Sequence, residues 1–155
     1  MIARIAAALV VAGLAACQPT NSSASAIERS PAGLEQVPLT ITTASGKAHR
    51  FTVEVARTPE QQAQGLMNRE SLGPDRGMIF PYEPPVAASF WMKNTLIPLD
   101  MIFIRADGII ARIEANTVPL SLDPVAAGEP VAAVLELAGG RSAELGIAPG
   151  AKVEW

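Results

Sequence analysis

Short segments in which apolar and polar residues alternate, separated by turn residues, constrain this chain more than any other feature. Leu39-Thr40-Ile41-Thr42 and Phe51-Thr52-Val53-Glu54-Val55 alternate in this way and flank Ser45-Gly46, which predicts an antiparallel hairpin with one solvated face. Asp107-Gly108 precedes another alternating segment, residues 109–118, and predicts a second hairpin. With 12 glycines, 13 prolines and no βαβ spacing among 155 residues, a parallel doubly wound fold is excluded.

The other expected elements are also short. Dense runs of bulky apolar residues over 86–92 and 99–104 predict strands buried on both faces, and residues 131–137 and 152–155 predict two more strands. Thr58, Pro59 and Gln61 form a capping box, which predicts a helix to about Met67 with its buried stripe at Ala63, Leu66 and Met67. A second helix is expected over residues 141–145, ended by Gly146. We therefore expect an α+β, mainly β fold, with an antiparallel or mixed sheet curled into a partly closed barrel and one or two short helices.

The N-terminal segment predicts where the protein is located in the cell. Arg4 precedes an apolar run, residues 5–16, and a helix of that length covers about 18 Å, against roughly 30 Å for the hydrocarbon core of a bilayer. A signal peptide is therefore favoured over a transmembrane helix. Leu14-Ala15-Ala16-Cys17 resembles the lipobox of bacterial lipoproteins, which implies cleavage before Cys17 and acylation of its thiol; the alternatives are a soluble secreted protein and a buried cysteine. Gln18 resembles the residue that follows the cysteine in lipoproteins of the outer membrane, and implies a periplasm-facing domain anchored to the lipid bilayer.

Cys17 is the one cysteine of the chain, so an acylated Cys17 leaves none for a disulfide or a nucleophile. Residues 18–36 are rich in Ser, Ala and Pro and contain few bulky apolar groups, which is typical of a flexible tether. The chain is thus divided into a lipoprotein signal peptide (1–16), a lipidated tether (17–36) and a single β-rich globular domain (37–155).

Composition excludes several classes of function. The 12 basic and 15 acidic residues are spread along the chain with a net charge of −3, so no basic patch exists to neutralise phosphates, and nucleic acid is not an expected partner. With His49 as the one histidine and no free thiolate, zinc sites, Ser-His-Asp triads and Cys-His pairs lack members. The acidic residues do not follow calcium-binding intervals. We expect no metal and no cofactor.

Sulfur and aromatic side chains each permit two interpretations. Four methionines either form a soft Cu(I) site or fill the core, and their apolar surroundings favour the core: Met67, Met78, Met92 and Met101. Similarly, three aromatic residues either wall a binding site or belong to the core: Phe80, Phe90 and Trp91.

Several different short motifs follow one another along residues 37–155. Phe90-Trp91-Met92-Lys93-Asn94-Thr95 is followed by Pro98-Leu99-Asp100, and the surrounding motifs are 65–69, 77–80, 134–140 and 146–150. Together they resemble the domain of unknown function 192 family. The resemblance implies a compact β-rich, partly barrel-like domain, often behind a signal or lipoprotein leader. It implies no reaction.

Polar residues beside the apolar strands form the candidate site: Arg69, Lys93, Asn94, Thr95 and Asp100. In a structural interpretation, Asp100 pairs with Lys93 or Arg69 and the others bond the loop backbone, because an unpaired buried charge costs several kcal/mol. In a functional interpretation, Arg69 and Lys93 bind a small anionic ligand that Asn94 and Thr95 orient, and Asp100 holds the two cations. The functional interpretation requires these side chains to meet in an open cavity.

Three functions remain open. The first is a lipid-anchored envelope protein with a small-ligand-binding or accessory domain. The second is a hydrolase or transferase with Asp100 as general base and Thr95 or water as nucleophile. The third is a protein-interaction module of an envelope complex, for which a large exposed apolar patch would be the sign.

Overall fold

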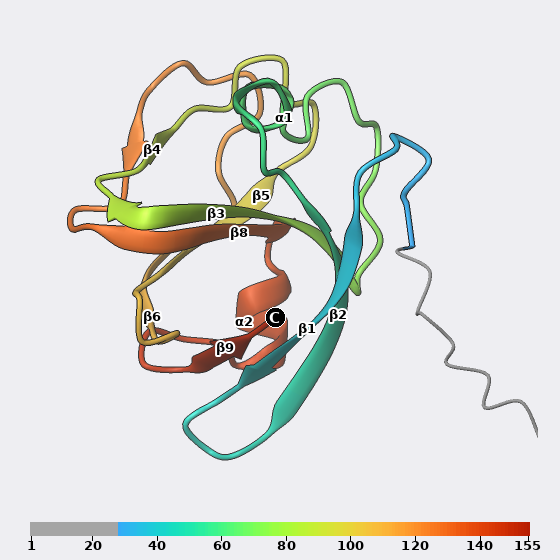
Figure 1. The fold of residues 1–155 in the computed structure, drawn as a ribbon. Coiled ribbons are helices and arrows are strands. Elements are labelled where there is room, and N and C mark those ends of the chain that lie inside the picture. Colours follow the sequence, from blue (N-terminus) through green and yellow to red (C-terminus); the bar gives the residue numbers. More distant parts are fainter. Residues whose placement is uncertain (1–27) are drawn as a thin grey trace, which may run out of the picture.

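A seven-stranded mixed sheet curls into a half-barrel and forms the body of the molecule (Figure 1). The computed structural model describes residues 28–155. Two strands, β4 (Ser89–Phe90) and β7 (Val125–Ala126), form a separate antiparallel pair. The strands of the main sheet, in their order across it, are β6 (Ile110–Glu114), β5 (Leu99–Ile104), β8 (Val131–Ala138), β3 (Arg76–Val86), β2 (Ala48–Val55), β1 (Gln36–Thr42) and β9 (Lys152–Glu154).

The two edges of the main sheet meet and partly close the barrel, as the sequence predicts. Ile109 and Lys152 form a β-bridge, the Ile110 N–H donates to the carbonyl of Ala151 at 2.9 Å, and the Val153 N–H donates to that of Gly108 at 2.8 Å. Within the sheet, β2 and β3 run parallel and the other neighbours run antiparallel. The sheet is therefore mixed.

Both predicted hairpins are confirmed. In the first, β1 and β2 pair with Leu39 opposite Phe51, and Gly46 turns the chain with φ of 81°. In the second, Asp107 Oδ1 accepts the Ile109 N–H at 2.9 Å and Gly108 has φ of 79°. The predicted strands at 99–104, 131–137 and 152–155 are confirmed as β5, β8 and β9.

The buried strand predicted over residues 86–92 is wrong. Val86 and Trp91 are 39% and 50% exposed, Val86 is the last residue of β3, and the separate strand β4 covers Ser89–Phe90 alone. The central position between β2 and β8 is instead filled by β3, which begins at Arg76 and was not predicted. Three prolines interrupt the second half of β3, where pairing with β8 shifts in register, and they hide its strand pattern: Pro81, Pro84 and Pro85.

The first helix is shorter than expected. Helix α1 (Pro59–Gln64) has the predicted capping box, but Gly65 ends it with φ of 46°, so it does not reach Met67. No residue of α1 is buried, which corrects the expected stripe: Ala63 is exposed, and Leu66 is buried just after the helix. Helix α2 (Arg141–Leu145) and its end at Gly146 are confirmed.

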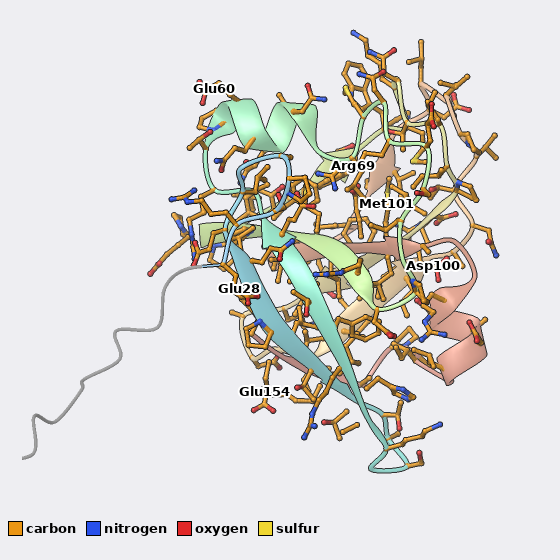
Figure 2. The ribbon with its side chains drawn as sticks, turned by 90° about the vertical axis from the view of Figure 1, so that its right-hand side faces the viewer. Glu28, Glu60, Arg69, Asp100, Met101 and Glu154 are labelled. Carbon is orange, nitrogen blue, oxygen red and sulfur yellow. The ribbon has the colours of Figure 1, made fainter. Side chains whose placement is uncertain are left out.

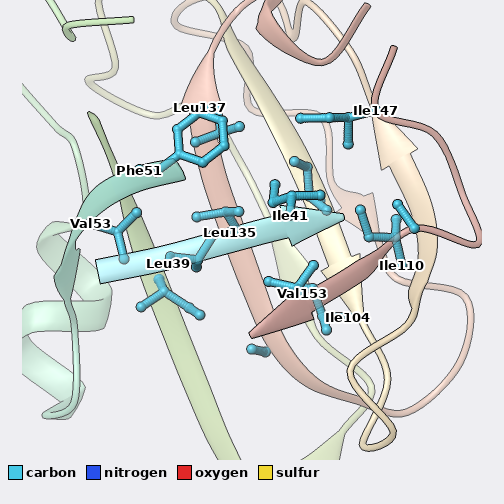
Figure 3. Packing of buried hydrophobic residues seen from close by; sticks show 14 of the residues in the cluster. Leu39, Ile41, Phe51, Val53, Ile104, Ile110, Leu135, Leu137, Ile147 and Val153 are labelled. Carbon is cyan, nitrogen blue, oxygen red and sulfur yellow. The ribbon is translucent and has the colours of Figure 1, made fainter. Parts of the chain in front are cut away.

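The core has two parts because the central strands are covered on both faces. One cluster fills the half-barrel, where side chains from β1, β2, β8 and β9 converge with those of the segment between α2 and β9 (Figure 3). The second covers the opposite face of β3, β5 and β8 and includes Met78, Phe80, Met92, Met101 and Phe103. Every residue of β5 is buried, as predicted for a strand buried on both faces.

The fold begins before Val37. The Gln36 N–H donates to the carbonyl of Glu28 at 2.7 Å, the Val55 N–H donates to that of Glu35 at 2.9 Å, and Ser30 is buried. Residues 28–36 therefore have hydrogen bonds to one another and to β2. The predicted signal peptide and Cys17 lie outside the described residues. Between residues 28 and 155, no helix has the length and apolar character needed to cross a membrane.

Candidate functional site

Arg69 and Asp100 do not meet. Arg69 forms a bidentate ion pair with Glu54, with Nη1–Oε1 and Nη2–Oε2 distances of 2.6 and 2.7 Å. Figure 2 shows Arg69 on the side of α1 and Asp100 beside α2. The hydrogen bonds that Arg69 donates to Glu54 raise the pKa of Arg69, so its charge is fixed and already neutralised. Arg69 is therefore not free to bind an anionic ligand, as the functional interpretation requires.

Asp100 is fully buried, and its carboxylate accepts hydrogen bonds from backbone amides. Its Oδ1 accepts N–H groups of Asn116 at 2.9 Å and Gly140 at 2.8 Å, and its Oδ2 accepts that of Ser142 at 2.8 Å. The carboxylate thus satisfies the first turn of α2. The expectation that Asp100 pairs with Lys93 or Arg69 is wrong, and a carboxylate sealed among amides has no access to a substrate as general base.

The other three predicted residues lie in the loop between β4 and β5. The carbonyl of Asn94 accepts the N–H of Asn68 at 2.8 Å, which joins this loop to the segment after α1. Lys93 Nζ lies 5.1 Å from the centroid of the Trp91 ring. Thr95 is buried and donates to the carbonyl of Lys93 at 3.3 Å, as the structural interpretation predicts for it. Of the five predicted residues, Thr95 lines the pocket described next.

A pocket of about 290 Å³ lies between the segment around α1, the outer face of β3 and β8, and the loop from β4. We call it the Glu136 pocket. Its walls are Gln62, Ala63, Gln64, Gly65, Leu66, Met67, Phe80, Tyr82, Ser89, Phe90, Trp91, Thr95 and Glu136. The rings of Phe80 and Phe90 pack edge to face, with centroids 5.0 Å apart and an interplanar angle of 82°. The three aromatic residues of the sequence prediction thus line a cavity, and Phe80 is also part of the core.

Glu136 is the unusual member of this pocket. It lies on β8 directly opposite Met78 of β3 and Met101 of β5, and it is 4% exposed. Within residues 28–155 no group donates a hydrogen bond to its carboxyl group, and burial alone raises the pKa of Glu136 to about 8. A buried carboxyl without a partner is a costly feature, and such groups concentrate at functional sites.

Tyr82 is the second titratable group of the pocket. Burial, and then the nearby charge of Glu136, raise the pKa of Tyr82 to about 12. The phenol therefore stays protonated and keeps its O–H available as a donor. Together the two residues offer a ligand one titrating acid and one neutral hydroxyl.

Glu136 is not among the residues predicted from the sequence, although its strand carries a signal. Residues 131–138 read Val-Ala-Ala-Val-Leu-Glu-Leu-Ala, and a single charged residue in such an apolar strand must be buried or functional. The same argument singled out Asp100. The strand alternation does not say which of two such acids finds partners, because the partners come from distant segments.

The sulfur atoms fill space in the second core cluster. Met78, Met92 and Met101 are at most 1% exposed there, and Thr117 Oγ1 lies 3.1 Å from Met92 Sδ. The part of the chain that the structure describes contains no group of three or more His, Cys, Asp or Glu placed to hold a metal ion. His49 is buried on β2.

Comparisons with known proteins agree with the sequence resemblance. The sequence profile of the DUF192 family, described as "Uncharacterized ACR", matches residues 40–155. A crystal structure of a protein of unknown function from Novosphingobium aromaticivorans is similar, with a TM-score of 0.81, 51% identity, and coverage of 85% of this chain and 94% of that one. A candidate transcription regulator from Sinorhizobium meliloti matches with a TM-score of 0.77, 45% identity, and coverage of 78% and 94%. No curated protein matches. This chain therefore belongs to the DUF192 family.

Proposed function

We propose that this protein is a lipid-anchored component of the bacterial cell envelope whose β-rich domain binds a small molecule in the Glu136 pocket. The observation that carries the binding function is the carboxyl group of Glu136, which has no hydrogen-bond donor among residues 28–155 and lines a cavity of about 290 Å³. Small-molecule sites are concave and mostly apolar, with a few polar groups that fix the ligand. The Glu136 pocket has this composition, with aromatic walls and the polar groups of Gln62, Tyr82 and Thr95.

The binding function does not require Arg69 or Asp100. Both are engaged with other groups of the protein, and their substitution would disturb the fold. The Glu136 pocket does not favour the anionic ligand expected from the sequence, because no lysine or arginine is among the residues that form its walls.

Thermal shift measurements on the full chain in a non-ionic detergent test the pocket. The probes are 1-butanol, butylammonium and butyrate, which share a four-carbon chain and differ in charge. At least one probe should raise the melting temperature of the wild type. Ser89 is exposed and lines the pocket, so Ser89→Trp should fill it and remove the shift without unfolding the domain. Equal shifts in wild type and Ser89→Trp, or no shift with any probe, would refute the binding function.

Anchoring rests on the lipobox-like residues 14–17 and is tested separately. Metabolic labelling with an alkyne fatty acid should label the wild type and not Cys17→Ser, and the wild type should fractionate with outer membranes. Several acyl chains hold a protein firmly, whereas one holds it only marginally. A labelled Cys17→Ser variant, or an unlabelled wild type, would overturn the anchor and leave the pocket unaffected.

An exposed apolar patch favours a second candidate function, a protein-interaction module. Two backbone hydrogen bonds join the loop after β4 to the loop before β7. The Met92 N–H donates to the carbonyl of Ser121 at 2.9 Å, and the Leu120 N–H donates to the carbonyl of Thr95 at 3.1 Å. They carry five large apolar side chains that are 48% to 68% exposed: Trp91, Leu96, Val118, Leu120 and Leu122. Apolar groups gathered in this way mark interaction surfaces.

A photo-crosslinking amino acid at position 120, compared with one at exposed Ser45 in the first hairpin turn, tests this candidate in intact cells. A discrete envelope protein crosslinked from position 120 alone, whose binding is lost in Leu122→Glu, supports an interaction module. Crosslinks to lipid alone, or the same products from both positions, count against it.

A further inference from the structure

We propose that the Glu136 pocket takes a small organic cation, an alkylammonium group, with Glu136 as its counter-ion and aromatic rings as its walls. This inference rests on the proposed binding function and names the ligand class of the same site. Three observations carry it: the charge of the pocket, the unmet need of Glu136 for a partner, and the aromatic lining.

The charge of the pocket has one sign. Of the residues that form its walls, Glu136 is the one with a carboxyl group, and none is lysine or arginine. An anionic ligand would face an acid with no compensating cation. A neutral ligand would leave Glu136 protonated, because it brings no charge that favours ionisation of the carboxyl group. A cation supplies what the pocket lacks.

The two arginines at the ends of the strand row that contains Glu136 are already in ion pairs. Glu136 lies in a row across the sheet in which Glu54, Met78, Glu136, Met101 and Glu114 stand opposite one another on successive strands. At one end of this row Arg69 is held by both oxygens of Glu54, and at the other Arg112 pairs with Glu114. The thioethers that separate Glu136 from these pairs donate no hydrogen bond. Among the acids of this row, Glu136 is thus the one without a counter-ion in the part of the chain that the structure describes.

Aromatic rings favour a cation over a neutral donor. Phe80, Tyr82, Phe90 and Trp91 line the pocket, and the face of an aromatic ring attracts a cation within about 6 Å of its centroid. Lys93, which is exposed and is not part of the pocket wall, has its ammonium group 5.1 Å from the centroid of the Trp91 ring, within this range. Alkylammonium ligands combine the charge that Glu136 requires with apolar groups that contact the rings.

Binding should release a proton. The empty pocket keeps Glu136 largely protonated at pH 7, because burial raises its pKa to about 8, and a bound cation favours the ionised form. The other ionisable groups on the elements around Glu136 do not compete for this role. Glu54 pairs with Arg69, and Glu114 pairs with Arg112. Asp100 accepts backbone amides, Tyr82 has a pKa of about 12, and Lys93 and Glu60 are exposed. Proton release near neutral pH therefore reports on Glu136.

Calorimetric titration of the full chain tests the ligand class. Butylammonium should bind about tenfold more tightly than 1-butanol, which has the same number of heavy atoms, and butyrate should bind more weakly than either. Glu136→Gln keeps the shape of the side chain and should weaken butylammonium binding by about tenfold or more, with little change for 1-butanol. Glu114→Gln, which lies on the same face beyond Met101, is the matched control and should bind butylammonium as the wild type does.

A second readout does not depend on any variant folding. Titrations of the wild type at pH 7 in phosphate and in Tris should differ in apparent enthalpy by the heat of about one released proton per butylammonium bound. Absence of proton release, or equal affinity for 1-butanol, overturns the cation assignment. If Ser89→Trp still abolishes the binding of 1-butanol in that case, the pocket remains a binding site. If no probe binds at all, the proposed binding function fails with it.

Two sources could supply an ammonium group to an envelope protein: a free amine or the headgroup of a phospholipid. Ethanolamine and glycerophosphoethanolamine, which carries the same ammonium group beside a phosphate, separate them. Tighter binding of ethanolamine assigns a free amine. Binding of glycerophosphoethanolamine at least as tightly assigns a lipid headgroup. If neither competes with butylammonium, the assignment of an ammonium ligand is rejected.

Discussion

The Oδ2 atom of Asp100 accepts the backbone N–H of Ser142 at 2.8 Å and so ties the start of β5 to the first turn of α2. Because Asp100 also accepts the N–H groups of Asn116 and Gly140, its removal would leave three amides without partners in a buried place. We expect Asp100→Ala to lower the free energy of unfolding by about 3 kcal/mol or more, measured by urea denaturation. Exposed Asp123, changed to Ala, should shift it by less than about 0.5 kcal/mol. A change of similar size in both variants would contradict this role for Asp100.

Glu136 should make the fold less stable in alkali. Burial raises the pKa of Glu136 from 4.5 to about 8, so between these values the folded chain holds a proton that the unfolded chain has lost. This contribution to stability is fully present below about pH 4.5 and is lost as pH rises toward and through 8. We expect the stability difference between Glu136→Gln and wild type to grow in favour of the variant, by a few kcal/mol, from pH 5 to pH 9. Urea midpoints across this range measure it, with Glu114→Gln as control. A pH-independent difference would show that Glu136 titrates normally.

The bidentate pair of Arg69 and Glu54 should contribute to stability through its burial. Glu54 has 9% and Arg69 26% of its side chain exposed, so each charge left alone would be partly desolvated. We expect a double-mutant cycle of Arg69→Gln and Glu54→Gln to give a coupling energy of about 2 kcal/mol. The exposed pair of Arg105 and Glu129 is the comparison and should give less than about 1 kcal/mol. Equal coupling in the two cycles would mean that burial adds nothing.

Gly77 should not tolerate a side chain. A Cβ atom there would lie 2.6 Å from the carbonyl oxygen of Glu136 and 2.8 Å from Leu137 Cδ2, between two paired strands. Because the nearest obstacle is backbone, we expect Gly77→Ala to destabilise the domain by about 2 kcal/mol or more. At Gly73 the nearest atom is in the flexible Arg76 side chain, at 3.2 Å, so Gly73→Ala should have a smaller effect. A thermal melt of both variants distinguishes them, and a wild-type melting temperature for Gly77→Ala would refute the close approach.

Local patterns along the chain determined many of the elements. The turn residues Ser45-Gly46 and Asp107-Gly108, the capping box at Thr58 and the apolar run of β5 each depend on neighbours in sequence, and each is confirmed. These features predicted a mainly β, partly closed barrel because alternation and turn geometry act over a few residues. The sequence also identified Phe80, Phe90, Trp91 and Thr95 as residues that could surround a site, and all four line the pocket.

Tertiary structure alone decided which polar residues are free to act. Asp100 and Glu136 are both single acids in apolar strands, yet Asp100 obtains amides from residues as distant as Ser142, and Glu136 obtains no donor from the described chain. Arg69 likewise receives Glu54 from a strand fifteen residues earlier. Strand alternation specifies that a side chain points inward, but its partners depend on strand order and on which loops cover the sheet. For this reason the chemistry of the pocket became visible only when β3, β5 and β8 were placed side by side.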